Sequence, residues 1–200
     1  MSNRIYQFKI ELLEITPTIW RRILVPEKYS FWDLHVAIQD AMGWQDYHLH
    51  NFRIAKNAFL DAISIGIPDN EGFADAEPQL TGWETPIADY FDEVGMQADY
   101  EYDFGDDWQH KITFEAILEK EEGVKYPRCI DGARACPPED CGGSYGYESM
   151  LEIIANPKHK EYKGMLSWLG GKFDHEKFNP ATVKFDNPKQ RFKLAFQDGF

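Results

Sequence analysis

Long apolar runs and cysteines are both scarce in this sequence of 200 residues. No stretch approaches the roughly 20 consecutive apolar residues that a membrane-spanning helix needs, so no membrane partner is expected. The first fifteen residues lack a basic end followed by an apolar block, so no signal peptide is expected. Three cysteines, an odd and small number, do not indicate a disulfide framework. Together these absences predict a cytoplasmic protein.

Lysine and arginine are absent between Asn57 and His110, a segment that holds fourteen of the 34 acidic residues. The net charge of −13 therefore arises in the middle of the chain. This segment would repel nucleic acid, because binding to a phosphate backbone depends on basic side chains that displace counterions. Nine Lys or Arg against four acids lie between Lys158 and Lys193. Nucleic acid, if it binds at all, is expected at this basic C-terminal region, and a solvated surface is the simpler interpretation.

Apolar and aromatic side chains are plentiful, at 43% and 15% of the residues, which is enough for a substantial packed core. Residues 5–15 alternate between apolar and polar and predict a half-buried strand, and residues 18–25 predict a second one. A helix is predicted over residues 31–42, because its apolar residues recur at helical spacing. Ser30 is the expected N-cap of this helix, and Gly43 is its stop signal.

The same patterns predict the remaining elements. Further strands are expected at 47–55, 57–64, 100–104 and 108–118, and short helices at 85–95, 147–155 and 160–170. Turn-forming residues predict long loops at 66–82 and 126–146. Strands clustered around a few helices predict an α+β fold, with a mixed, largely antiparallel sheet packed against those helices in a single compact domain over residues 1–200. The core is expected at about residues 5–155, with 156–200 as a C-terminal extension that packs on it.

Two histidines, His48 and His50, stand two residues apart in the predicted strand 47–55. Side chains at i and i+2 share one face of a strand, and two imidazoles placed in this way can chelate a metal. The alternative is that both rings form hydrogen bonds with backbone or carboxylate groups beside the helix. This structural role is favoured, because isolated histidines in folded proteins usually have such partners.

Three cysteines, Cys129, Cys136 and Cys141, lie in the predicted loop 126–146 and are separated by six and four residues. Thiolates on such a loop can bind zinc with a histidine as the fourth ligand, and His110 on the predicted hairpin is a candidate. The sequence contains no C-x-x-C pair, however, and C-x4-C alone is weak evidence. Three small buried residues in a tight loop are the simpler interpretation.

The turn of the predicted hairpin contains the triplet Asp103-Phe104-Gly105, which binds magnesium in protein kinases. The other kinase motifs are absent from this sequence, so Gly105 is expected to supply a positive φ for the turn instead. Asp103, Asp106 and Asp107 can still bind a hard cation such as calcium or magnesium, although they lack the spacing of an EF-hand. Solvated turn carboxylates are the simpler interpretation.

Four segments in order along the chain are IWRRILVP, FWDLHVAIQDAMGWQDYHLHNFRI, YEYDFGDDWQHKITFE and YPRCIDGARACPPEDCGGSYGYESMLEI. Together they resemble the plasmid pRiA4b ORF-3-like family. The resemblance implies a compact α+β domain with a mixed sheet packed on helices, and it implies no defined activity. Some names used in the family suggest transposon resolvases. Neither Ser2 nor the adjacent Arg21 and Arg22 match the catalytic groups that a serine or tyrosine recombinase needs.

The leading hypothesis from the sequence is a non-enzymatic module that binds an unknown protein or small-molecule partner. Its site is expected in a concavity between the strand of the two histidines, the hairpin and the cysteine loop. The side chains expected to line it are His48, His50, Asp103, Trp108 and His110. Two alternatives stay open: a metal-dependent, zinc hydrolase-like enzyme that uses nearby histidine and acidic groups, and a nucleic-acid accessory protein of mobile-element origin.

Overall fold

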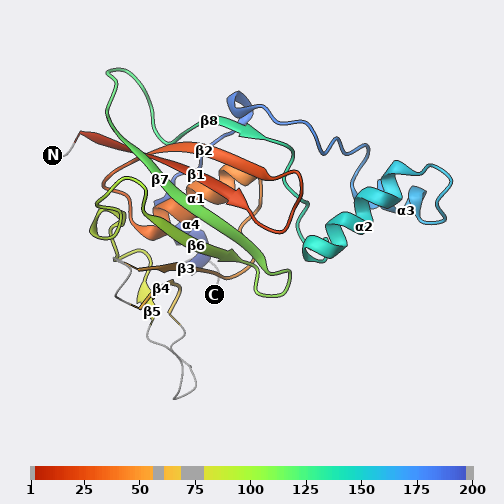
Figure 1. Ribbon diagram of the computed structural model, residues 1–200, viewed down its shortest axis with the longest axis horizontal. Helices are drawn as coiled ribbons and strands as arrows, with labels where there is room; N and C mark the ends of the chain where they lie inside the picture. The colour runs from red at the N-terminus through yellow and green to blue at the C-terminus, as the bar shows by residue number, and fades with distance from the viewer. Residues whose placement is uncertain (1–2, 56–60, 69–78, 197–200) are drawn as a thin grey trace, which may run out of the picture.

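The computed structural model describes residues 3–55, 61–68 and 79–196. These residues form one eight-stranded sheet, in the order β5-β4-β3-β6-β7-β1-β2-β8, with helices packed on and beside it (Figure 1). The strands are β1 (Arg4–Leu12), β2 (Ile19–Pro26), β3 (His50–Ile54), β4 (Ile63–Gly66), β5 (Gln79–Thr81), β6 (Gln97–Tyr102), β7 (Trp108–Glu119) and β8 (Arg128–Ala133). Neighbouring strands are antiparallel except β4 and β5. The predicted α+β fold with a largely antiparallel sheet is confirmed.

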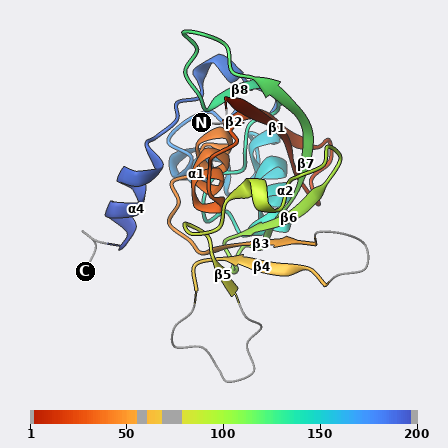
Figure 2. The ribbon, with the colours of Figure 1, turned by 90° about the vertical axis from the view of Figure 1, so that its left-hand side faces the viewer.

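The sheet curves around α1 (Phe31–Met42), which lies against its concave face (Figure 2). Alternate residues of the central strands β1 and β7 enter the core between sheet and helix, among them Phe8, Ile112 and Phe114, each with none of its surface exposed. Leu34 and Ile38 meet them from the helical face that the sequence spacing predicts. Burial of these large apolar side chains is the main favourable contribution to stability.

The N-terminus of α1 carries the predicted cap. Ser30 Oγ accepts a hydrogen bond from Asp33 N at 3.2 Å, and Asp33 Oδ2 accepts one from Ser30 N at 3.2 Å, which completes a capping box. Gly43 ends the helix with a φ of 100°, a conformation that glycine adopts without steric penalty. Both ends of this helix were therefore encoded locally, by residues next to it in the sequence.

Replacement of Ser30 by alanine is expected to lower the free energy of unfolding by about 1 kcal/mol, because the Asp33 N–H loses its partner. Urea unfolding followed by circular dichroism measures this change. Ser30→Thr keeps a hydroxyl at the same position and should remain within about 0.5 kcal/mol of the unmodified protein. Equal losses in the two variants would contradict the capping explanation.

Helices α2 (Gly143–Ala155) and α3 (Tyr162–Trp168) project beyond one end of the sheet (Figure 1). After a 3-10 turn at Pro180–Thr182, the chain returns as α4 (Pro188–Phe196) and packs on the side of α1 that faces away from the sheet (Figure 2). Phe192 and Phe196 of α4 contact Trp32 of α1, with ring centroids 5.7 and 5.4 Å apart. The C-terminal segment thus covers apolar surface of α1.

Several elements differ from the sequence-based predictions because tertiary contacts decide them. β8 lies inside the predicted cysteine loop and pairs with β2, and β5 lies inside the loop predicted at 66–82. The predicted helix 85–95 is a single 3-10 turn, Ile87–Asp89. Part of the predicted strand 57–64 falls outside the described residues, and β4 begins at Ile63. α4 lies in a region where no helix was predicted.

Candidate functional site

Three loops meet at one end of the sheet: the α1–β3 connection, the β6–β7 turn and the segment that precedes α2. Trp44 Nε1 donates to Pro137 O at 2.9 Å, and the Gln45 N–H donates to Glu139 Oε1 at 2.7 Å. These bonds join the first and third loops. The Gly142 N–H donates to Asp106 Oδ2 at 3.0 Å and joins the third loop to the turn.

The convergence brings one imidazole and two carboxylates together. His48 Nε2 lies 3.0 Å from Asp140 Oδ1 and 3.5 Å from Asp103 Oδ2, and all three ligand atoms lie within 4.8 Å of one another. His48 Nε2 is shielded from solvent, yet none of its neighbours in the described part of the chain has the alignment of a hydrogen-bond partner. The ring nitrogen therefore approaches two carboxylates without donating a well-formed hydrogen bond to either.

Backbone conformation fixes both carboxylates of this group. Asp103 and Asp140 have φ angles of 58° and 55°, a left-handed conformation that Asp and Asn tolerate better than most residues. Asp103 Oδ1 accepts the Gly105 N–H at 3.0 Å, which leaves Oδ2 directed at His48. The positive φ expected at Gly105 belongs instead to Asp103 and Asp107. A Cβ on Gly143 would come within 2.5 Å of Asp106 O, so the close approach of α2 to the turn requires glycine there.

Three of the predicted pocket residues lie in the core. His50, Trp108 and His110 are at most 2% exposed, so in this structure they do not line an open pocket, in contrast to the prediction. His48 precedes β3, so it does not share a strand face with His50 as predicted. His50 stacks on His35 with ring centroids 3.5 Å apart, and burial, followed by the nearby His35, lowers the pKa of His50. Only His48 and Asp103 of the predicted set reach the new site.

The predicted cysteine zinc site is not assembled. Among the described residues, His48, Asp103 and Asp140 are the sole group of at least three His, Cys, Asp or Glu whose ligand atoms gather in this way. Cys129 lies on β8, and Cys136 and Cys141 lie in the loop that follows; all three are free thiols. Burial raises the pKa of each thiol, to about 12 for Cys141, so the metal-free side chains are neutral thiols.

A second polar cluster, centred on His35, escaped sequence analysis because His35 sits within the apolar face of α1. His35 Nδ1 lies 2.8 Å from Tyr100 Oη, and its Nε2 lies 2.7 Å from Asp46 Oδ1. Gln39 Nε2 donates to the same Tyr100 oxygen at 2.9 Å. Arg191 of α4 contacts Asp46 at 3.3 Å. His35 and Tyr100 have no exposed surface, so this network is structural and holds the C-terminal helix to the core.

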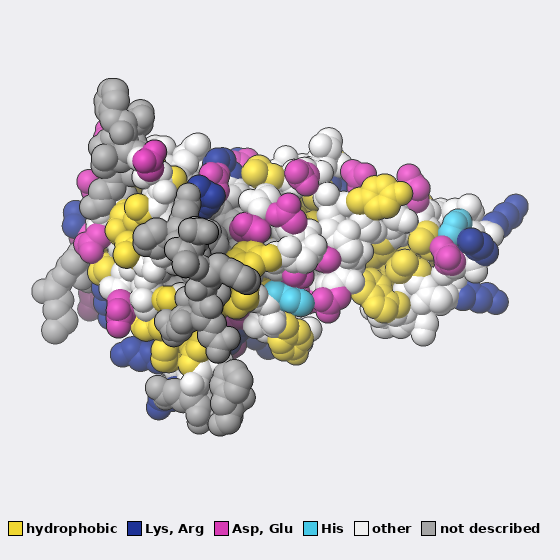
Figure 3. Space-filling view, turned by 90° about the horizontal axis from the view of Figure 1, so that it is seen from below, with side chains coloured by type: hydrophobic (Ala, Val, Ile, Leu, Met, Phe, Trp, Pro, Cys, Tyr) yellow, Lys and Arg dark blue, Asp and Glu magenta, His cyan; other side chains and the backbone are white. Residues whose placement is uncertain are grey.

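The basic C-terminal region includes one arginine that is held by acidic partners. Arg191 forms ion pairs with Asp40, Asp46 and Asp186, so its charge already has partners within the protein. Figure 3 shows Lys and Arg at the end formed by α2 and α3 and also among the acidic side chains over the rest of that face. No helix within residues 3–55, 61–68 and 79–196 is both long and apolar enough to cross a membrane.

Known proteins resemble this chain over most of its length. Residues 4–182 match the family described as plasmid pRiA4b ORF-3-like protein. The uncharacterized protein y4hQ of Sinorhizobium fredii (strain NBRC 101917 / NGR234) is 31% identical over 175 residues, which cover 85% of this chain and 83% of that protein. The crystal structure of MM3350, a protein of unknown function from Methanosarcina mazei Go1, matches with a TM-score of 0.83 and 43% identity, over 92% of this chain and 100% of that one.

Proposed function

This chain belongs to the plasmid pRiA4b ORF-3-like family, and we propose that it is a binding module whose ligand is a divalent transition-metal ion, zinc foremost. The observation that carries the proposal is the convergence of His48, Asp103 and Asp140 from three separate loops. One imidazole and two carboxylates suit zinc, manganese or iron, whereas calcium and magnesium sites consist of oxygen ligands.

The spacing of the three side chains supports a shared metal. Two ligand atoms that each lie about 2.1 Å from zinc are about 3.0 Å apart at a 90° angle and about 3.4 Å apart at the tetrahedral angle. The distances from His48 Nε2 are 3.0 Å to Asp140 and 3.5 Å to Asp103. The absence of an aligned hydrogen bond at His48 Nε2 also fits a ring nitrogen that shares a cation with the carboxylates.

The test is calorimetric titration of the reduced, chelator-treated protein with Zn²⁺ and Mn²⁺. We expect one site per chain, and a 10- to 100-fold lower affinity, about 1.4 to 2.7 kcal/mol, in Asp103→Asn and Asp140→Asn. Asparagine tolerates the same positive φ, so these variants should fold. Asp107→Asn is the matched control, because Asp107 lies in the same turn with a φ of 54° but outside the group.

Two results would refute the metal proposal: absence of a stoichiometric site, or equal affinities in all three variants. Substitution with Co²⁺ separates this site from the cysteine alternative, because thiolate ligands add a charge-transfer band that nitrogen and oxygen ligands lack. A strong band that persists in Asp103→Asn would assign the metal to the cysteines instead.

A second candidate function, a metal-dependent hydrolase, is favoured by the number of ligands. Catalytic zinc sites have three protein ligands and an open position for water, whereas structural sites are closed by four. The side chain of Asp140 is 68% exposed, so solvent can reach the metal from that side. Hydrolysis of p-nitrophenyl acetate or phosphate by the metal-loaded protein, lost in Asp103→Asn, would support the enzyme; metal binding without turnover would support the binding module.

A further inference from the structure

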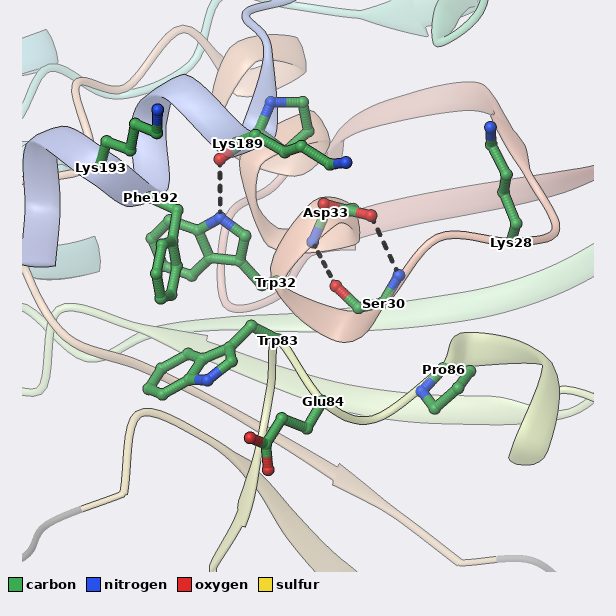
Figure 4. Close-up of a pocket in the computed structure, with 11 residues that line it drawn as sticks. Lys28, Ser30, Trp32, Asp33, Trp83, Glu84, Pro86, Lys189, Phe192 and Lys193 are labelled. Carbon is green, nitrogen blue, oxygen red and sulfur yellow. Dashed lines mark hydrogen bonds between the residues drawn. The ribbon is translucent and has the colours of Figure 1, made fainter.

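We propose that a second site, between α1, α4 and residues 82–86, binds a small anion that carries an aromatic ring. A cavity of about 450 Å³ lies there (Figure 4). Its volume falls within the range of about 300 to 1,000 Å³ that small-molecule sites occupy. None of its lining residues belongs to the group of His48, Asp103 and Asp140, so this site is independent of the metal proposal.

Aromatic side chains form the apolar wall of the cavity. Trp32 Nε1 donates to Pro188 O at 3.0 Å, so the polar atom of this indole is satisfied. Trp32 is only 3% exposed, so the partly buried Trp83 and Phe192 supply most of the accessible aromatic surface. The ring of Trp83 lies 5.2 Å from Phe192 of α4, and Trp83 is only partly buried. Figure 4 shows both indoles projecting toward α4, with Phe192 beside them. A wall of this kind favours a flat ring, which can stack or make edge contacts with it.

Lysines surround this wall. Lys28, Lys189 and Lys193 line the cavity, and all three are exposed. Within the described residues, no carboxylate forms an ion pair with any of their amines at 4 Å or less. Three lysines around one cavity give it a local group of positive charges, although the chain has a net charge of −13. Such a local positive field is complementary to an anionic group on the ligand.

Two carboxylates also line the cavity and offset part of its positive charge; burial raises the pKa of Asp33, and the charges of Lys189 and Lys28 oppose that shift. Asp33 Oδ2 accepts the Ser30 N–H at 3.2 Å as part of the helix cap. Glu84 points away from the two indoles, on the side opposite the lysines, in Figure 4. Lysines outnumber acids in the lining, so the cavity pairs an aromatic wall with an excess of positive charge. A nucleoside monophosphate and an aromatic carboxylate both have the complementary chemistry, a ring joined to an anion.

The test is calorimetric titration of the full chain with 2-naphthoate, adenosine monophosphate, neutral 2-naphthol and the cation 2-naphthylmethylammonium. We expect at least one of the two anions to bind at one site. Its affinity should be about tenfold higher than that of the neutral 2-naphthol and of the cation 2-naphthylmethylammonium. Binding of only one anion identifies whether a nucleotide or an aromatic carboxylate is the better ligand class. The double variant Lys189→Met/Lys193→Met should weaken anion binding about tenfold, because it removes two of the three lysines.

The matched control is Lys158→Met/Lys160→Met, which removes two exposed lysines of the same basic region outside the cavity. This control should bind the anion like the unmodified protein. The proposal is overturned if neither anion binds at 1 mM, if 2-naphthol binds as tightly as the anions, or if the two lysine pairs have equal effects. Because all four substituted lysines are exposed, both variants should fold, and thermal unfolding checks this.

Discussion

Replacement of Arg21 by leucine is expected to lower the free energy of unfolding by about 3 kcal/mol. Arg21 is 1% exposed, and its guanidinium donates to three carbonyls: Ala41 O at 2.9 Å, Trp20 O at 2.8 Å and Ala133 O at 2.9 Å. These bonds join β2 to the last turn of α1 and to β8. Leucine would leave the carbonyls buried without a donor.

The adjacent residue, Arg22, supplies the control. It points to the other face of β2, where it pairs with Glu115 at 2.6 Å and Asp131 at 3.0 Å while its side chain is 25% exposed. Arg22→Leu should lower stability by about 1 kcal/mol, because Arg22, Glu115 and Asp131 are all partly exposed and water can solvate the two carboxylates after the substitution. Urea unfolding of both variants measures the difference. Equal losses would contradict a role for Arg21 as the connection between helix and edge strand.

Sequence reasoning succeeded for the fold where the information is local. The capping box of Ser30 and Asp33, the spacing of α1 and the alternation of β1 all depend on residues close together in the chain. β8 depends on distant ones. A Cβ on Gly132 would lie 2.5 Å from the ring of Phe178 and 2.7 Å from Trp20 O, so β8 needs glycine where it passes between these two distant segments. Nothing in its own sequence predicts that pairing.

The candidate site was partly predictable for the same reason. His48 and Asp103 were among the expected pocket residues, because histidine and carboxylate near a hairpin are chemically conspicuous. The third member, Asp140, follows the rigid Pro137-Pro138 pair. Its place in the site depends on distant contacts, such as that of Trp44 with Pro137, which the sequence does not reveal. His110 was predicted to line the pocket because alternation with period two places it on one face of a strand. The alternation does not reveal that this face is buried in the core.

The same burial makes His110 a source of acid sensitivity. Its Nδ1 donates to Tyr100 O at 3.2 Å and Trp108 O at 3.0 Å, and its Nε2 has no partner among the described residues. Protonation would place an unpaired N–H and a charge in the core, and burial accordingly lowers the pKa of His110 to about 4. An unfolded histidine, with a pKa of about 6.5, takes up its proton first.

Stability should therefore be complete above pH 6.5 and should fall as the pH drops toward 4, because the unfolded state binds more protons in that interval. His110 alone should remove about 2 kcal/mol between pH 7 and pH 5. Buried carboxylates with raised pKa values, such as Asp33 and Asp40, oppose this trend, so the contribution of His110 is isolated by a variant.

His110→Gln keeps an amide that can donate to the same carbonyls but cannot titrate. Urea unfolding at pH 7 and pH 5 should give a smaller loss of stability for this variant than for the unmodified protein, by about 2 kcal/mol, whatever its stability at pH 7. His159→Gln, at a partly exposed histidine between α2 and α3, should keep the original pH dependence. If the loss between the two pH values is unchanged in His110→Gln, the acid sensitivity arises elsewhere in the core.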